Sequence, residues 1–262
     1  MLHAIDALQL SLGEAISIQT HSEVFYLQRQ QQHWQLTRVA LDHPYCTLAA
    51  ELEITRSVTV PSRAEPVQRW TSGEQESTLR IVPAMADKNL VTHLGQPMMI
   101  PAGRRPKFYL SLPLMYQLYI GNGKQPFYEF FVEKLPLTWF GSNTRRGELC
   151  YQFFSDIAQD IETSAQVPHR AILEIRLCNR DGENLLVDKI NLPAQYLPVY
   201  RVDGKAFWTT ALSITNEKLT DELSLHYSKT VPVRHELLQL ISEPRLRSEA
   251  RTIMRALEAI IG

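Results

Sequence analysis

Apolar and polar residues alternate with a period of two along most of this chain, from near its start to about Val231. Successive side chains of a β-strand point to opposite faces, so this alternation predicts strands with one buried face. The apolar positions form several short runs: Ile16 and Ile18; Trp34 and Leu36; Leu173, Ile175 and Leu177; Trp208, Leu212 and Ile214; and Leu223, Leu225 and Tyr227. Asn122-Gly123, Asp181-Gly182 and Asp203-Gly204 are typical of hairpin turns, because these residue types tolerate positive φ. We therefore predict a mainly β fold with antiparallel pairing.

The apolar spacing becomes helical after Val233. Leu237, Leu240 and Ile241 fall on one helical face, and Ser242 and Pro244 suit the cap and first turn of a second helix. The second run places its apolar residues three or four positions apart: Leu246, Ala250, Ile253, Met254, Leu257 and Ile260. This pattern predicts a C-terminal amphipathic helical segment.

Three parts of the chain follow from these patterns. We predict an N-terminal β unit over residues 1–78, an antiparallel β-sandwich over residues 79–231 and the helical segment over residues 232–262. The first boundary follows a stretch between Pro61 and Ser77 that is rich in proline and polar residues. The second lies at Val231-Pro232, where the strand pattern stops.

The charge balance excludes several classes of protein. The chain has 27 Lys and Arg against 28 Asp and Glu, so no basic surplus neutralises a phosphate backbone, and we expect no nucleic-acid partner unless the charges are segregated locally. No apolar stretch reaches the ~20 residues of a membrane helix, and the N-terminal residues lack a secretory signal, so we expect no direct membrane insertion. Three widely spaced cysteines suit the reduced thiols of a cytoplasmic protein.

No motif for catalysis, cofactor binding or metal binding occurs in the sequence. Gly121-Asn122-Gly123-Lys124 lacks the Ser or Thr of a nucleotide-binding loop, and the run from Asn179 to Asn184 lacks the spacing of a calcium loop. Both favour turns. Cys150 lies in an apolar run, which favours a buried structural thiol over a nucleophile. We predict no catalytic residue, no cofactor and no metal site.

Aromatic residues are dense between Phe127 and Phe154, where Trp139 and Tyr151 flank a loop with Arg145 and Arg146. These aromatics have two interpretations: the core of the sandwich, or a ligand or partner surface edged by a basic pair. The apolar face of the predicted helix also has two interpretations: it packs on its own domain, or it docks on a partner or a second copy of the chain. Its candidate contacts are Arg251, Met254 and Leu257.

One family resembles this chain. Lys134, Thr138, Phe140-Gly141 and Gly147-Glu148-Leu149-Cys150-Tyr151 follow one another in an order that resembles the signature of DUF432, a family of uncharacterised archaeal and bacterial proteins. Three more blocks are similar: Ile81 to Gly103, which includes Asp87-Lys88; Tyr109 to Leu114; and Leu173 to Asn179. The resemblance covers about residues 79–231 and transfers no activity or catalytic residue. It implies a soluble accessory subunit on the cytoplasmic part of a small-conductance mechanosensitive channel.

We predict a non-enzymatic cytoplasmic protein-interaction module that binds a protein partner or a second copy of itself. Its candidate contact residues are Trp139, Arg145, Arg146, Tyr151, Arg251, Met254 and Leu257. A small-ligand or carbohydrate-binding β-sandwich is an alternative, and it requires a pocket beside Arg145. A cryptic enzyme is another, and it requires Glu148 or Asp156 to converge with a histidine.

Overall fold

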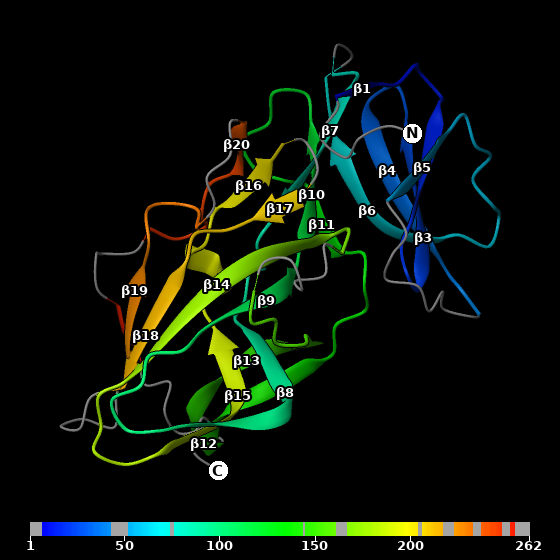
Figure 1. Cartoon of the computed structure of the whole chain (residues 1–262). Helices are drawn as coiled ribbons and strands as arrows, with labels where there is room; N and C mark the ends of the chain where they lie inside the picture. The colour runs from blue at the N-terminus through cyan, green and yellow to red at the C-terminus, as the bar shows by residue number, and fades with distance from the viewer. Residues whose placement is uncertain are drawn as a thin grey trace. The chain divides into compact units, whose positions relative to one another are not determined.

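The computed structural model describes residues 7–42, 52–73, 76–143, 145–160, 167–203, 206–216, 223–232, 237–247 and 252–254. Strands dominate these residues (Figure 1), and the prediction of a mainly β protein is confirmed. The chain forms two compact units, each made from two separate stretches. The first unit is Met1–Ala84 with Leu114–Lys134, and the second is Met85–Pro113 with Leu135–Gly262.

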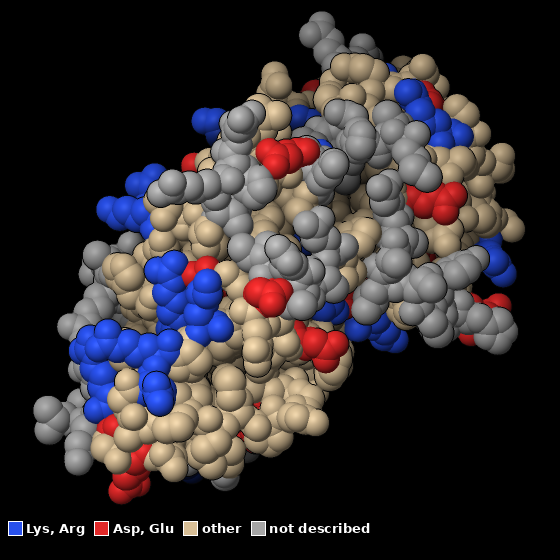
Figure 2. Space-filling view, viewed as in Figure 1, with Lys and Arg blue, Asp and Glu red and all other residues tan. Residues whose placement is uncertain are grey.

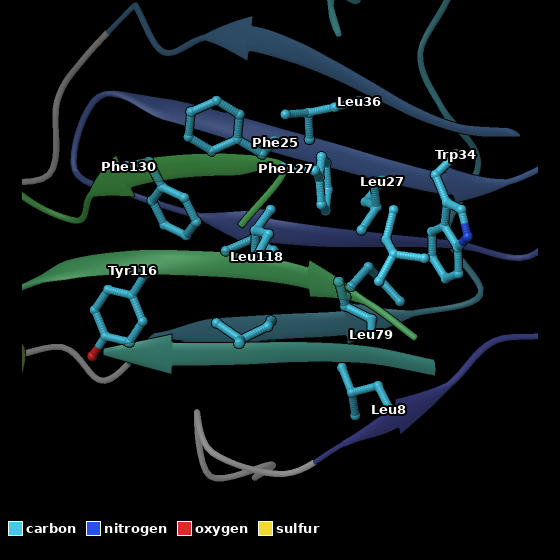
Figure 3. Packing of buried hydrophobic residues seen from close by; sticks show 14 of the residues in the cluster. Leu8, Phe25, Leu27, Trp34, Leu36, Leu79, Tyr116, Leu118, Phe127 and Phe130 are labelled. Atoms are coloured by element: carbon cyan, nitrogen blue, oxygen red, sulfur yellow. The ribbon is translucent and has the colours of Figure 1, made fainter. Parts of the chain in front are cut away.

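Two antiparallel sheets build the first unit. One has the order β5-β2-β3-β4-β6, with strands Glu53–Arg56, Ala15–Gln19, Glu23–Arg29, His33–Ala40 and Glu65–Thr71. The other has the order β1-β7-β10-β11, with strands Leu8–Gln9, Thr78–Ala84, Met115–Ile120 and Tyr128–Phe131. Residues from both sheets form a single hydrophobic cluster (Figure 3), in which Phe25 and Trp34 meet Leu79, Leu118 and Phe130. The alternating residues of β2 and β4 are buried in this cluster, as their period of two predicts.

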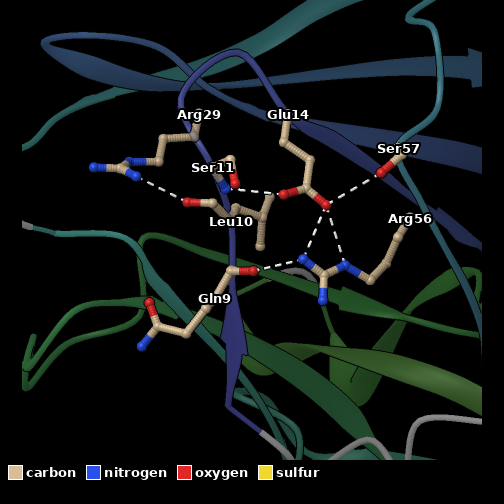
Figure 4. Close-up of polar contacts among 7 residues, drawn as sticks. All are labelled: Gln9, Leu10, Ser11, Glu14, Arg29, Arg56 and Ser57. Atoms are coloured by element: carbon tan, nitrogen blue, oxygen red, sulfur yellow. Dashed lines mark hydrogen bonds and ion pairs between the residues drawn. The ribbon is translucent and has the colours of Figure 1, made fainter.

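A polar cluster fastens the turn between β1 and β2 to the end of β5 (Figure 4). Arg56 donates to the Glu14 carboxylate through Nε and Nη2, at 3.1 and 2.9 Å, and Nη2 also reaches the Gln9 carbonyl at 2.7 Å. The Ser11 amide donates to the second Glu14 oxygen at 2.8 Å. The hydrogen bond from the Ser11 amide, together with Arg56, lowers the pKa of Glu14, although burial opposes this shift. The ionised carboxylate therefore holds the turn in place.

Two further sheets build the second unit. The smaller has the order β12-β13-β8-β15, with strands Leu137–Asn143, Arg146–Phe154, Leu90–Ile100 and Leu185–Leu192. The larger has the order β20-β16-β17-β14-β18-β19-β21, and β9 also pairs with β14. These strands are Leu238–Ser242, Val199–Val202, Ala206–Trp208, Arg170–Asn179, Leu212–Asn216, Leu223–Tyr227, Thr252–Met254 and, for β9, Lys107–Pro113. A 3₁₀ turn, Ala194–Tyr196, follows β15. The pairing is mixed, because β13 runs parallel to β8, and β17 and β18 run parallel to β14.

The long strand β14 is buried on both faces between Arg170 and Ile175. Its alternation predicts an exposed Glu174, but this side chain is only 2% exposed. Tyr109 donates its hydroxyl to Glu174 at 3.0 Å, and Arg176 donates Nε to the other oxygen at 2.6 Å. These two donors compensate for the lost hydration of the carboxylate.

The predicted turns have different outcomes. Asp203 connects the antiparallel strands β16 and β17 with a φ of 49°, which is the positive value expected of this hairpin. Asn122-Gly123 lies between the antiparallel strands β10 and β11, as predicted. The prediction of a hairpin at Asp181-Gly182 is wrong, because the strands on either side of it, β14 and β15, belong to different sheets. Local turn chemistry marks a change of direction but not the next strand's partner.

The prediction of a C-terminal amphipathic helix is also wrong for the described residues of this segment, where strands form. Leu238–Ser242 form β20, which pairs with β16, and Thr252–Met254 form β21, which pairs with β19. A short apolar run fits both helix and strand periods, and here the backbone groups of β16 and β19 give each segment a partner. Arg251 and Leu257 lie outside the described residues, and Met254 belongs to β21. Within the part of the chain described, no helix has the length and hydrophobicity needed to cross a bilayer.

Candidate functional site

The antiparallel hairpin of β12 and β13 separates its side chains cleanly onto two faces. Phe140 and Cys150 point to one face and are buried in a cluster with Val91 of the neighbouring strand β8. Leu137 lies opposite Tyr151, and Trp139 lies opposite Leu149, so these four side chains share the other face. We call this set, Leu137, Trp139, Leu149 and Tyr151, the hairpin face.

Three large apolar side chains of the hairpin face are open to solvent. Leu137 is 54% exposed, Trp139 48% and Leu149 46%. Single exposed apolar residues are ordinary, whereas neighbouring ones on adjacent strands form a contiguous patch. The buried residues on the reverse side fix the hairpin, so the exposed side chains are presented from a rigid support.

Gly147 allows Trp139 to lie close to the backbone of the hairpin. A Cβ atom at this position would be 2.6 Å from the Phe140 carbonyl oxygen and 2.6 Å from the indole Nε1 of Trp139. Neither distance is compatible with a side chain. Glycine therefore determines the orientation of the indole.

Tyr151 is anchored at its hydroxyl end by a pair of residues between β7 and β8. The hydroxyl donates to Asp87 Oδ1 at 2.9 Å, and Lys88 donates to Asp87 Oδ2 at 2.6 Å. The Lys88 ammonium also lies 5.3 Å from the centroid of the Tyr151 ring, in cation–π contact. Tyr151 is consequently the half-buried end of the hairpin face.

The loop between β7 and β8 that holds this pair contacts both the 3₁₀ turn and the segment after β20. Gln195 donates to the Asp87 carbonyl at 3.3 Å, and Arg245 donates Nε to the Met85 carbonyl at 2.8 Å. Burial alone would raise the pKa of Asp87, but hydrogen bonds from Lys88 and Tyr151 outweigh it and lower the pKa. The pKa of Tyr151 is raised by burial and by Asp87. At neutral pH the group is a carboxylate, an ammonium and a neutral phenol.

Glu148 occupies the buried side of the hairpin. Its Oε1 accepts hydrogen bonds from the side-chain amides of Asn89, at 2.6 Å, and Asn191, at 3.0 Å. The carboxylate therefore connects β13 to β15 and to the residue that precedes β8. Its partners here are amides, which hold a carboxylate in place without moving a proton.

Cys150 is buried, as its apolar sequence context predicts. Desolvation, with a contribution from Glu148, raises the pKa of its thiol to about 12. The thiolate is the nucleophilic form of cysteine, and the raised pKa keeps this thiol protonated at neutral pH. Among the residues described, no group of three or more His, Cys, Asp or Glu side chains is arranged to hold a metal ion.

The structure brings Trp139 and Tyr151 together on the hairpin face, and it places Arg145 exposed at the turn between β12 and β13. Arg146 is the first residue of β13. Sequence reasoning assigned no role to the anchors Asp87 and Lys88, which are far from Tyr151 in the sequence. The one signal for Asp87-Lys88 was its place in a block similar to the family pattern, and the fold sets that block against the signature residue Tyr151.

The family model of DUF432, described as a protein of unknown function, matches residues 8–259. The match spans nearly the whole chain, so the chain belongs to this family. No curated protein and no solved structure matches the chain.

Proposed function

We propose that this DUF432 member is a non-enzymatic protein-interaction module, a β-sandwich protein whose contact surface is the hairpin face. The observation that carries the proposal is the contiguous exposure of Leu137, Trp139 and Leu149 on a hairpin that is fixed from behind. Buried tryptophans at the centre of an interface commonly contribute about 2 kcal/mol or more. Trp139, held by Gly147, is the expected hot spot, and Arg145 at the turn is a rim contact.

A small-ligand or carbohydrate-binding role is the second candidate, because Trp139 offers a ring for stacking. Sugar sites, however, surround such a ring with polar groups that orient the hydroxyls. The neighbours of Trp139 on the hairpin face are leucines and the anchored Tyr151. Leucines favour the apolar surface of a protein partner. The buried, protonated Cys150 thiol and the amide-bound Glu148 support a non-enzymatic role.

The partner we propose is the cytoplasmic part of a small-conductance mechanosensitive channel, with a second copy of this chain as the alternative. The proposal of a channel partner is based on the resemblance to the family alone, and it includes a cytoplasmic location. Both partners use the same surface, so one pair of variants tests them together.

The test compares wild-type protein with the double variant Trp139→Ala, Leu149→Ser and a matched control, Leu12→Ser, Met99→Ser. The control removes two exposed apolar side chains from other parts of the surface. Binding to the purified cytoplasmic part of a channel is measured by calorimetry, and self-association by light scattering. We expect binding by wild type and control, and a loss of at least about tenfold in the double variant, as for a hot spot of this size.

Equal binding by the double variant and the control would remove the hairpin face as the contact surface. A monomer that binds no channel would refute both partners. Preferential stacking of a sugar on Trp139, seen as fluorescence quenching that the double variant abolishes, would favour the ligand-binding candidate.

A further inference from the structure

A second surface of this nearly neutral protein is strongly basic. The chain's net charge is −1, yet the segment before β9 and the end of β14 place five exposed cations together: Arg104, Arg105, Lys107, Arg176 and Arg180. Figure 2 shows Lys and Arg side chains gathered at the lower left, over the end of β14. We call these five residues the basic face.

The backbone holds the two contributing segments side by side. Gly103 donates to the Asn179 carbonyl at 2.9 Å, and Asn179 donates to the Arg104 carbonyl at 3.0 Å. Gly103 has a φ of 73°, which glycine adopts without strain, and this turn sets the direction of Arg104. The positions of the arginines are therefore determined by the fold rather than by a flexible tail.

Two of the cations are directly opposite each other. Lys107 pairs with Arg176 in the ladder of β9 and β14, and like charges at facing positions destabilise a sheet. Each is held by its other neighbour: Arg176 by Glu174, and Lys107 over the ring of Tyr109, 5.6 Å from its centroid. Two positive charges at facing positions favour the binding of an anion between them.

We propose that the basic face binds an acidic segment of a partner protein, independently of the hairpin face. Guanidinium groups held in fixed directions suit individual carboxylates, which they bind through two parallel hydrogen bonds. In the described segments 104–109 and 174–183 the acidic residues are Glu174, which is buried and paired with Arg176, and Asp181 and Glu183, which follow Arg180. Five cations therefore accompany three acidic residues in these described segments.

The composition of the two segments distinguishes this partner from other polyanions. Single-stranded nucleic acid needs exposed aromatic rings for base stacking, and a membrane surface favours exposed large apolar side chains beside the charges. In the described segments 104–109 and 174–180 the large apolar and aromatic residues Phe108, Tyr109, Ile175 and Leu177 are all buried. The exposed residues of these segments are the five cations.

The test uses a short fluorescent Glu-rich peptide and its Gln counterpart, with binding to the full chain followed by anisotropy at low salt. The test variant is Arg104→Glu, Arg105→Glu, Lys107→Glu. Its matched control is Arg63→Glu, Arg69→Glu, Lys124→Glu, which reverses three exposed cations of the first unit. We expect the Glu peptide alone to bind, the test variant to lose about tenfold or more in affinity, and the control to change by less than about threefold.

Equal binding of the two peptides, or equal affinities of the test variant and the control, would overturn the proposal. A preference for phosphatidylserine vesicles or a single-stranded oligonucleotide over the Glu peptide, lost in the test variant, would assign the face to those polyanions instead. If the charge-reversed protein misfolds, the neutral variant Arg104→Gln, Arg105→Gln replaces it in the binding test. Its thermal unfolding midpoint shows whether this variant is folded. Trp139→Ala should leave peptide binding unchanged, which separates this face from the hairpin face.

Discussion

Replacing Gly147 with alanine tests whether the hairpin face is built as the structure shows. The new Cβ would lie 2.6 Å from the Phe140 carbonyl oxygen and 2.6 Å from the Trp139 indole nitrogen. Carbon and carbonyl oxygen ordinarily approach to about 3.3 Å, so the overlap is about 0.7 Å. The indole can turn away, but the Phe140 carbonyl belongs to the β12–β13 hairpin and can shift only with the strand.

Overpacking of this kind costs roughly 1–3 kcal/mol. At about 2–4 °C per kcal/mol for a chain of this size, we expect the thermal unfolding midpoint to fall by about 2–12 °C. The matched control is Gly95→Ala in β8, where an added Cβ meets nothing within 4 Å and no change is expected. Acrylamide quenching of tryptophan fluorescence should increase in Gly147→Ala alone, because the displaced indole becomes more exposed.

The double variant Gly147→Ala, Trp139→Ala separates the two overlaps. Removing the indole should recover part of the lost stability, and the remainder reports the overlap with the Phe140 carbonyl. Equal unfolding midpoints and equal quenching for Gly147→Ala and Gly95→Ala would refute the packing of Trp139 over Gly147.

Other predictions concern the polar and buried groups. Asp87→Asn should destabilise by about 1 kcal/mol at pH 7, since the ion pair is partly exposed; because the pKa of Asp87 is lowered on folding, its stabilisation exists above the unfolded pKa of about 4 and disappears as pH falls through the folded pKa. Urea unfolding of the variant and wild type across this range measures it, and a pH-independent difference would contradict it. Glu174→Ala should cost roughly 3 kcal/mol in the same assay, more than Glu174→Gln, because it leaves the Tyr109 hydroxyl buried without its acceptor. Glu14→Ala should cost about 1 kcal/mol by releasing the turn between β1 and β2, with Glu53→Ala as an exposed control. Cys150 should react with a thiol reagent only in denaturant, since its raised pKa keeps it protonated; rapid labelling of the folded chain would be inconsistent with its burial.

Local pattern predicted much of the secondary structure and part of the candidate site. The period of two identifies the buried side chains of β2 and β4, because side-chain direction in a strand depends only on the strand itself. The sequence pattern also singled out Trp139 and Tyr151 as candidate contact residues, but only the register of β12 with β13 places them on one face. The same rule fails at Glu174, because β14 is covered on both faces and the second cover comes from elsewhere in the chain.

Pairing partners could not be read from the sequence for a related reason. The parallel pairs of β8 with β13 and of β14 with β18 join segments far apart in the chain, and no local spacing encodes them. The prediction of a C-terminal helix is wrong at β20 for the same reason. A short apolar run carries little preference of its own, and hydrogen bonds to β16 determine its conformation.

The amino-acid sequence by itself determined that this chain is mainly β, which side chains alternate inward, and that its total charge is nearly zero. Only the tertiary structure decided where those charges lie and which aromatic rings stay exposed. It gathers five cations onto the basic face although the balance of the chain is −1. It sets Asp87 and Lys88 under Tyr151 and leaves Trp139 open to solvent. Composition is a sum over residues, whereas binding depends on which of them the pairing of distant strands makes neighbours.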